Sequence, residues 1–173
     1  MQVVQAPNPT LRTVTRPVKK ITPALLATLK EMVKLTKTFK DPEGVGLAST
    51  QIGLDGSFFI IKDKEKFINV INPKIISKSK ATKTYLEGCL SIPKHWGIVE
   101  RHLSIRVNYQ DEKGKTLVKS LKGQLAWFFQ HEMDHLEGIL FVDHVLAQKG
   151  KLYKVAGKDK TGTDIFEEIS LQV

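Results

Sequence analysis

The sequence has little of what disulfide-bonded, exported or membrane-spanning proteins need. Cys89 is the single cysteine among 173 residues, which excludes an intrachain disulfide and favours a reducing compartment. No apolar run approaches the ~20 residues of a membrane span. The first eleven residues lack the basic and apolar segments of an export signal. We therefore expect a cytoplasmic protein that does not contact a membrane, with an organellar or viral source left open.

Arginine is also scarce. Only four of the 27 basic residues are arginine, although their excess over 18 acidic residues gives a net charge of +9. Proteins that read nucleic acids favour arginine, because its planar guanidinium binds phosphates and guanine edges in a fixed geometry. We therefore interpret the scattered lysines as a solvated surface and expect no DNA partner. A basic face toward the RNA of a ribosome is the alternative.

The overall composition is typical of one globular unit. With 41% hydrophobic and 26% charged residues, the chain is too balanced for a disordered protein. At this length, folding buries roughly 70% of the surface that the unfolded chain exposes. Repeats and linker-like stretches are absent, so we expect a single domain over residues 1–173.

Hydrophobic periodicity predicts two helices. The first covers residues 22–39, starts at a Thr-Pro pair and is ended by the Asp-Pro pair at 41–42. A glycine-rich segment, 43–53, follows it. The second helix covers residues 123–138 and ends at a glycine suited to a C-cap.

The rest of the chain favours strands, and Asp111–Gly114 is typical of a hairpin turn. The predicted strands are Phe58–Ile61, Phe67–Ile71, Ile98–Val99, Leu103–Val107, Thr116–Val118 and Ile139–Val142. Leu152–Val155 and Ile165–Val173 predict a β-hairpin within the tail, 147–173. Because strands and helices do not alternate regularly, we predict an α+β fold. Mainly antiparallel sheets would pack around the second helix, with the first helix added at the N-terminal side.

The strongest chemical signal is the HExxH motif on the second helix. His131 and His135 are four residues apart, so both imidazoles project from one helix face and can bind one metal ion. Glu132 lies beside the first histidine and can act as general base toward a water molecule activated by the metal. The motif therefore predicts a metal-dependent hydrolase.

A catalytic metal needs a third protein ligand and an open position. The residues leave three candidates open. Glu137 is close in sequence but points from another helix face, and Glu167 or Glu168 would suit a zincin-type endopeptidase. Cys89 is the third, because a thiolate beside two imidazoles suits iron or zinc. A nucleophilic role for Cys89 has less support, since both motif histidines are better used by the metal.

Three ordered motifs carry a family resemblance. They are Gly44-Val-Gly-Leu-Ala-Ser-Thr-Gln51, Glu87-Gly-Cys-Leu-Ser91 and Gln130-His-Glu-Met-Asp-His135. In order and spacing the chain resembles the peptide deformylases from about residue 2 to about residue 146. The resemblance implies a hydrolase that removes the formyl group from the N-formylmethionine of newly synthesised polypeptides and releases formate.

The resemblance also implies roles for particular residues. The metal ligands would be Cys89, His131 and His135, and the metal would be ferrous iron, with zinc, nickel or cobalt also accepted. The Gln51 side-chain amide and the Leu90 backbone N–H would stabilise the negative charge that develops on the formyl oxygen.

The substrate pocket is predicted from the residues themselves. Gly44 and Gly46 lack side chains, so an extended peptide could pair with that backbone by β-augmentation, although glycines in a turn are the alternative. Trp127 and Phe128 share the helix face of the histidines and would form an apolar pocket for methionine, narrowed by the two rings. Ordinary core packing is the alternative for both rings. Further candidate lining residues are Gln124, Val45, Tyr85 and Ile92.

Three features depart from the family pattern. Ser49 replaces the second of two adjacent alanines, and Trp96 stands where bacterial members often have an arginine that holds the substrate backbone. The tail after about residue 147 favours strands, where many bacterial members end in a helix. Arg101 is retained, and we expect it to pair with Glu87.

Two other functions compete with this interpretation. A zincin-type endopeptidase would use Glu167 or Glu168, but it leaves Cys89 and Gln51 without roles. A metal-binding relative without activity is the second alternative, and the intact set of catalytic residues speaks against it.

Overall fold

A computed structural model describes residues 1–40 and 43–169. Within these residues, none of the helices combines the length and apolar character needed to cross a membrane. The helical elements are η1 (Pro9–Arg12), α1 (Pro23–Thr36), η2 (Ser49–Ile52), α2 (Gly123–Leu136) and α3 (Phe141–Ala147). The strands are β1 (Gly46–Ala48), β2 (Phe58–Asp63), β3 (Lys66–Lys78), β4 (Thr82–Cys89), β5 (Ile92–His102), β6 (Ser104–Gln110), β7 (Thr116–Lys122), β8 (Leu152–Lys158) and β9 (Asp164–Ile169).

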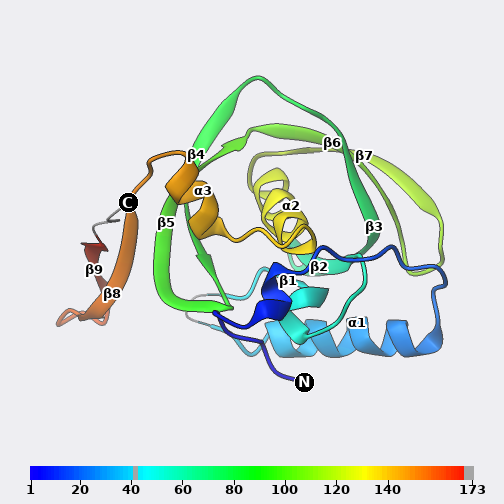
Figure 1. Ribbon diagram of the computed structural model, residues 1–173, viewed down its shortest axis with the longest axis horizontal. Helices are drawn as coiled ribbons and strands as arrows, with labels where there is room; N and C mark the ends of the chain where they lie inside the picture. Colours follow the sequence, from blue (N-terminus) through cyan, green and yellow to red (C-terminus); the bar gives the residue numbers. More distant parts are fainter. Residues whose placement is uncertain (41–42, 170–173) are drawn as a thin grey trace.

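Two antiparallel sheets surround α2, which confirms the predicted α+β fold. One sheet has the order β1-β2-β3-β6-β7 and the other the order β4-β5-β8-β9. Figure 1 shows α2 enclosed by the strands, with α1 along the outside. The metal motif is therefore held in the interior of the molecule.

The five-stranded sheet separates the two long helices. Along β2, Phe59 and Ile61 pack in the cluster that includes Phe129 of α2, whereas Phe58 and Ile60 pack against Leu29 and Met32 of α1. Successive side chains of a strand point to opposite faces, so the four apolar residues that begin β2 supply a core to both helices. The helix α2, which carries the motif, therefore packs on a sheet whose opposite face is covered by α1.

Both predicted helices are present, with one boundary moved. Thr22 accepts a hydrogen bond from the Leu25 N–H and caps α1 as expected. However, α1 ends at Thr36, not near residue 39, because the N–H groups of Thr38 and Phe39 bond to carbonyls only three residues back. The Asp-Pro pair expected to stop it lies outside the described residues.

The second helix begins at Gly123 as predicted and ends two residues before the predicted limit of 138. It ends at Leu136, and Gly138 follows with φ +70°. A Cβ there would fall 2.5 Å from the carbonyl oxygen of Arg12, so both the backbone conformation and the close approach require glycine.

The predicted strand Ile139–Val142 is wrong, because the chain forms α3 there. Asp143 accepts a hydrogen bond of 2.8 Å from the Leu140 N–H at the start of the helix. Phe141 and Val145, four residues apart, are both buried against the face of β5 at Gly97. A short apolar run cannot distinguish a strand from a buried helical turn.

Two strands are missing from the sequence prediction. β1 lies inside the glycine-rich segment, and β4 has no clear alternation of apolar and polar residues. β4 forms because β5 pairs with it along its whole length, from Thr82 opposite His102 to Cys89 opposite Ile92. β4 is thus one arm of a hairpin with the next strand along the chain, and its strand character comes from this pairing rather than from its own residue pattern.

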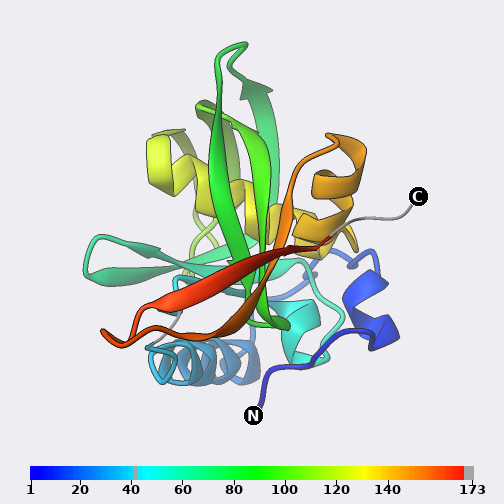
Figure 2. The ribbon, with the colours of Figure 1, turned by 90° about the vertical axis from the view of Figure 1, so that its left-hand side faces the viewer.

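The tail forms a hairpin. β8 pairs with β9, and β8 also pairs with β5 from His95–Lys154 to Gly97–Leu152. Figure 2 shows this hairpin crossing the front of the β4–β5 ribbon. Residues 170–173 of the predicted last strand lie outside the described residues.

Candidate metal centre

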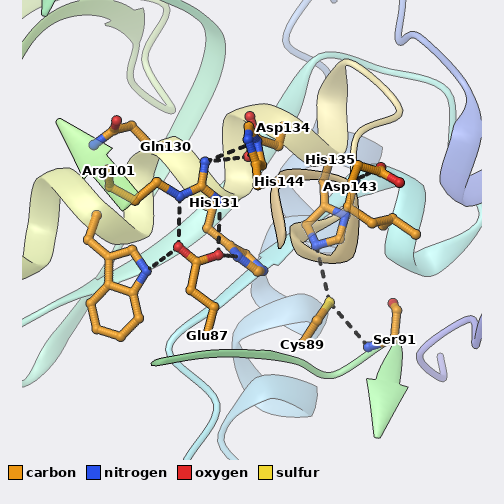
Figure 3. Close-up of polar contacts among 12 residues, drawn as sticks. Glu87, Cys89, Ser91, Arg101, Gln130, His131, Asp134, His135, Asp143 and His144 are labelled. Atoms are coloured by element: carbon orange, nitrogen blue, oxygen red, sulfur yellow. Dashed lines mark hydrogen bonds and ion pairs between the residues drawn. The ribbon is translucent and has the colours of Figure 1, made fainter. Parts of the chain in front are cut away.

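Two elements bring three side chains to one point. Cys89 ends β4, whereas His131 and His135 lie one turn apart on α2. One ligand atom from each residue lies within 4.8 Å of the others, and Cys89 Sγ is 3.2 Å from His135 Nε2. Figure 3 shows the cysteine facing the ring of His135 from the neighbouring strand. Sequence positions 89 and 131–135 thus meet in one cluster.

A tight turn fixes the thiol. Cys89 pairs with Ile92, so Leu90 and Ser91 form the two-residue connection between β4 and β5. The Ser91 N–H donates to Cys89 Sγ over 3.4 Å. The turn therefore places Leu90 directly beside the cluster and directs the sulfur toward α2.

Gln51 orients the same sulfur. Its Nε2 donates to Cys89 Sγ over 3.3 Å and to Ser91 Oγ over 3.1 Å, while its Oε1 accepts from the Ala48 N–H. The side chain is only 2% exposed. In this arrangement, both contacts of Nε2 are with protein atoms, so donation to another acceptor requires one bond to be exchanged.

A buried carboxylate orients the first histidine. Glu87 accepts hydrogen bonds from His131 Nδ1 (3.0 Å) and Trp127 Nε1 (2.7 Å), and it accepts two from Arg101. Because Glu87 is ionised, His131 must carry its proton on Nδ1, which leaves Nε2 free for the cluster. The expected Arg101–Glu87 pair is confirmed, with distances of 2.7 and 2.9 Å.

The network continues behind the cluster. Arg101 Nη1 also donates to Asp134 (2.6 Å), which accepts a second bond from His144 Nε2 (2.8 Å). Figure 3 shows this chain running from Glu87 through Arg101 to His144. The guanidinium is 5% exposed and lies between two carboxylates. Its charge is therefore compensated within the protein.

The network changes the acidity of two groups. Burial alone would raise the pKa of Glu87, but hydrogen bonds from Arg101 and His131 lower it to about 2. Burial would likewise raise the pKa of the Cys89 thiol, but the charge of His135 and hydrogen bonds from both histidines lower it to about 5. The cluster therefore favours the thiolate, the form that binds metals.

Glu132 is the buried acid of the site. It is 4% exposed, its Oε2 has no hydrogen-bond partner among the described residues, and burial raises its pKa to about 7. A Cβ at Gly46 would fall 2.2 Å from Glu132 Oε1. The absence of a side chain at position 46 thus makes room for this carboxylate.

These residues fit a single metal ion. A thiolate and two imidazoles form a donor set suited to iron or zinc, and the Glu87–His131 contact is the outer support that metal-bound histidines commonly have. Glu132 is not one of the three donors, but it lines the same cavity as Cys89 and His131. This arrangement leaves a position for water beside a base.

A cavity of about 210 Å³ adjoins the cluster. Its lining contains the expected residues Val45, Gly46, Gln124, Trp127 and Phe128, together with Leu86 and Trp96. β1 is the edge strand of its sheet, so its backbone next to the cavity has a free side. The cavity is bounded mainly by apolar side chains and one unpaired strand edge.

Other candidate residues lie elsewhere. Gly44 does not line the cavity, and a Cβ there would fall 2.4 Å from the Thr36 carbonyl oxygen, which explains the glycine by packing. Tyr85 stacks on Trp127 with ring centroids 4.3 Å apart and does not line the cavity, and Ile92 lines a second cavity.

The competing glutamates do not join the cluster. Glu137 is exposed beyond the end of α2. Glu167 and Glu168 lie on β9, where they pair with Lys154 (3.9 Å) and Lys151 (3.0 Å). Within residues 1–40 and 43–169, Cys89 is the third donor that accompanies the histidines.

The bonds from Glu87 to His131 and Trp127 are not predicted from the sequence, nor is the Asp134–His144 contact. One signal was available, because Glu87 and Cys89 are two apart on a strand and therefore share a face. A buried donor cluster, a buried carboxylate and an adjoining cavity place the chain among the metal-dependent hydrolases.

Comparison with known proteins defines the family. The sequence model described as polypeptide deformylase matches residues 1–151. The chain is 42% identical over 143 residues to a peptide deformylase of Desulforudis audaxviator, covering 82% of this chain and 91% of that protein. It is 39% identical over 163 residues to one of Mesorhizobium japonicum, covering 89% and 91%.

Solved structures agree. The crystal structure of the Thermotoga maritima peptide deformylase matches with a TM-score of 0.78 and 35% identity over 83% of this chain and 95% of that one. The Synechococcus elongatus enzyme, in complex with actinonin, matches with a TM-score of 0.79 and 34% identity over 83% and 78%. The chain belongs to the polypeptide deformylase family, metal-dependent enzymes that remove N-formyl groups from nascent peptides.

Proposed function

We propose that Cys89, His131 and His135 hold the catalytic metal of this deformylase and that Glu132 is its general acid and base. The observation that carries the proposal is the convergence of the three donor atoms in a cavity that is also lined by Glu132, a buried residue with an unpartnered carboxylate oxygen. A divalent ion bound there supplies Lewis acidity, which makes water a nucleophile near neutral pH and polarises the formyl group. We further propose ferrous iron, since a thiolate with two imidazoles suits it.

Glu132 moves the proton. Its carboxylate accepts a proton from the attacking water and returns it to the amine that leaves as the formamide C–N bond breaks. A pKa raised to about 7 by burial suits both tasks, because the group takes up and releases a proton with little free-energy cost.

Gln51 and Leu90 stabilise the charge that develops on the formyl oxygen. Gln51 Nε2 lies 3.3 Å from Cys89 Sγ and 3.1 Å from Ser91 Oγ, and it would exchange its bond to Ser91 for one to the formyl oxygen of the substrate. The Leu90 N–H lies in the turn directly after Cys89.

The substrate backbone pairs with Val45 and with Gly46 at the start of the edge strand β1, and its methionine side chain enters the cavity beside Trp127 and Phe128. Gly44 acts indirectly, by allowing this segment to approach α1.

Formate release tests the proposal. The protein is prepared anaerobically with iron or with nickel and incubated with formyl-Met-Ala, and we expect stoichiometric formate and Met-Ala. No release with either metal would refute deformylase activity for this chain. A comparison of iron, nickel and zinc contents after purification under anaerobic conditions tests the choice of ferrous iron.

We also propose that the enzyme works in the cytoplasm and meets ribosomes through its lysine-rich surface. The net charge of +9 supports attraction to ribosomal RNA. Sedimentation with ribosomes should decrease as salt is raised, because phosphate contacts release counterions. If association is absent or does not depend on salt, the lysines form a solvated surface and do not bind ribosomes.

A further inference from the structure

The tail hairpin stands outside the family match but next to the site. The family model ends at residue 151, whereas β8 and β9 cover residues 152–169. β8 joins the sheet that carries Cys89 through its pairing with β5, including Trp96 opposite Tyr153. The hairpin thus extends that sheet in the order β4-β5-β8-β9 and crosses in front of β4 and β5 in Figure 2. The β8–β9 hairpin therefore adds a surface beside the site that the family model does not include.

The hairpin and the β4–β5 turn enclose a second cavity of about 490 Å³. Its far side is formed by Val155 to Lys158 and Asp164 of the hairpin. Its near side contains Gly88, Cys89, Leu90 and Trp96, which also line the first cavity. The two cavities thus meet beside a proposed metal ligand.

Trp96 stands at this junction, because it lines both cavities. A Cβ at Gly88 would fall 2.9 Å from the Trp96 ring, so the ring lies against the backbone next to Cys89. Phe166 of β9 meets the same ring edge-on at 6.2 Å. The hairpin therefore fixes the side chain that separates the cavities.

The second cavity has an apolar floor and a basic rim. Leu90, Ile92 and Val155 contribute the apolar surface, while Lys94 and Lys158 contribute positive charge. The acid in its lining, Asp164, lies 3.2 Å from Lys158. Among residues 1–40 and 43–169, no acidic side chain is within ion-pair distance of Lys94. The rim therefore favours an anionic side chain.

We propose that this second cavity binds the third residue of the formylated peptide and prefers an acidic side chain there. The inference rests on the proposed function. In an extended peptide, the first and third side chains share a face and lie ~7 Å apart. With the first side chain in the cavity beside Trp127, the third reaches across Trp96 toward Lys94.

Matched peptides test the proposal. We would measure kcat/KM for formyl-Met-Ala-Glu-Ser and formyl-Met-Ala-Lys-Ser and normalise each to formyl-Met-Ala. The acidic peptide should be favoured about 2- to 5-fold, the range of a partly exposed ion pair. Lys94→Glu should reverse the preference. Lys80→Glu, the same charge change on an exposed residue outside both cavities, should leave it as in the wild type.

A second pair of variants tests the hairpin. Phe166→Ala removes the ring beside Trp96 and should reduce the acidic preference, whereas Ile165→Ala on the same exposed strand should not. Circular dichroism checks that both variants fold.

Equal rates for the two tetrapeptides, or the same effect of Lys94→Glu and Lys80→Glu, would overturn the proposed subsite. Failure to deformylate formyl-Met-Ala would instead refute the proposed function, so the two failures are distinguishable.

Discussion

At the scale of single residues, Glu132 is the group on which turnover should depend most. Glu132→Gln keeps the size of the side chain but cannot accept a proton, so kcat/KM for formyl-Met-Ala should fall by about 10²- to 10⁴-fold. Metal content, measured by elemental analysis, should stay near one ion per chain. Glu137→Gln, an exposed residue just past the same helix, should behave as the wild type. A near-normal rate for Glu132→Gln would remove this residue from the mechanism.

Gly46 is the second sensitive position. Gly46→Ala places a Cβ 2.2 Å from Glu132 Oε1, so the carboxylate must move. We expect kcat to fall by at least about 10²-fold, as for a displaced catalytic group, with little change in the thermal unfolding midpoint. Unchanged kcat would show that the carboxylate has room that the structure does not indicate.

At the scale of elements, the Arg101 network ties β4, β5, α2 and α3 together. Arg101→Met leaves the carboxylates of Glu87 and Asp134 buried without their cation, which should lower the free energy of unfolding by about 3–5 kcal/mol. Arg106→Met, the same change on an exposed residue of β6, should stay within about 0.5 kcal/mol of the wild type. Urea unfolding measures both. Equal effects would show that the network adds no stability.

Asp143, at the start of α3, should make the stability of the fold decrease at acid pH. Partial burial raises the pKa of Asp143, but hydrogen bonds from Arg12 and the Leu140 N–H lower it below its usual range. A lowered folded-state pKa stabilises the fold above the unfolded pKa of about 4, and this contribution is lost as pH falls through the folded value. The midpoint of Asp143→Asn should therefore lie below that of the wild type at pH 6 and approach it by pH 3. A constant gap would contradict the assignment.

The elements differ in how far they can be predicted. The limits of α2 and the convergence of His131 with His135 follow from helix periodicity and one terminal glycine, which are local signals. The strand character of β4 depends on its pairing with β5, and the contact between Glu87 and Trp127 joins residues that are 40 positions apart. The prediction at 139–142 failed because a short apolar run suits a strand and a helix equally, and only contact with β5 decides between them.

At the scale of the whole molecule, the proposed metal joins a strand of one sheet to the helix that packs on the other. Binding at 100 times the dissociation constant stabilises a protein by about 2.7 kcal/mol. For a chain of this size, that corresponds to a rise of roughly 5–10 °C in the unfolding midpoint. Chelation should remove the rise.

Two variants separate metal binding from catalysis. Cys89→Ala should abolish both bound metal and the metal-dependent shift, whereas Glu132→Gln should keep the shift. Retention of metal and shift by Cys89→Ala would show that the thiolate is not the third ligand.

The close approach of Gly46 to Glu132 also limits how resistance to an inhibitor could arise. A compound that lies along the edge of β1 contacts backbone at a position that cannot gain a side chain without displacing the Glu132 carboxylate. A substitution of Gly46 that excludes such a compound would therefore also lower the deformylase activity. We expect tolerated escape changes to fall on the outer walls of the cavity, such as the exposed Leu86, and not on the strand itself.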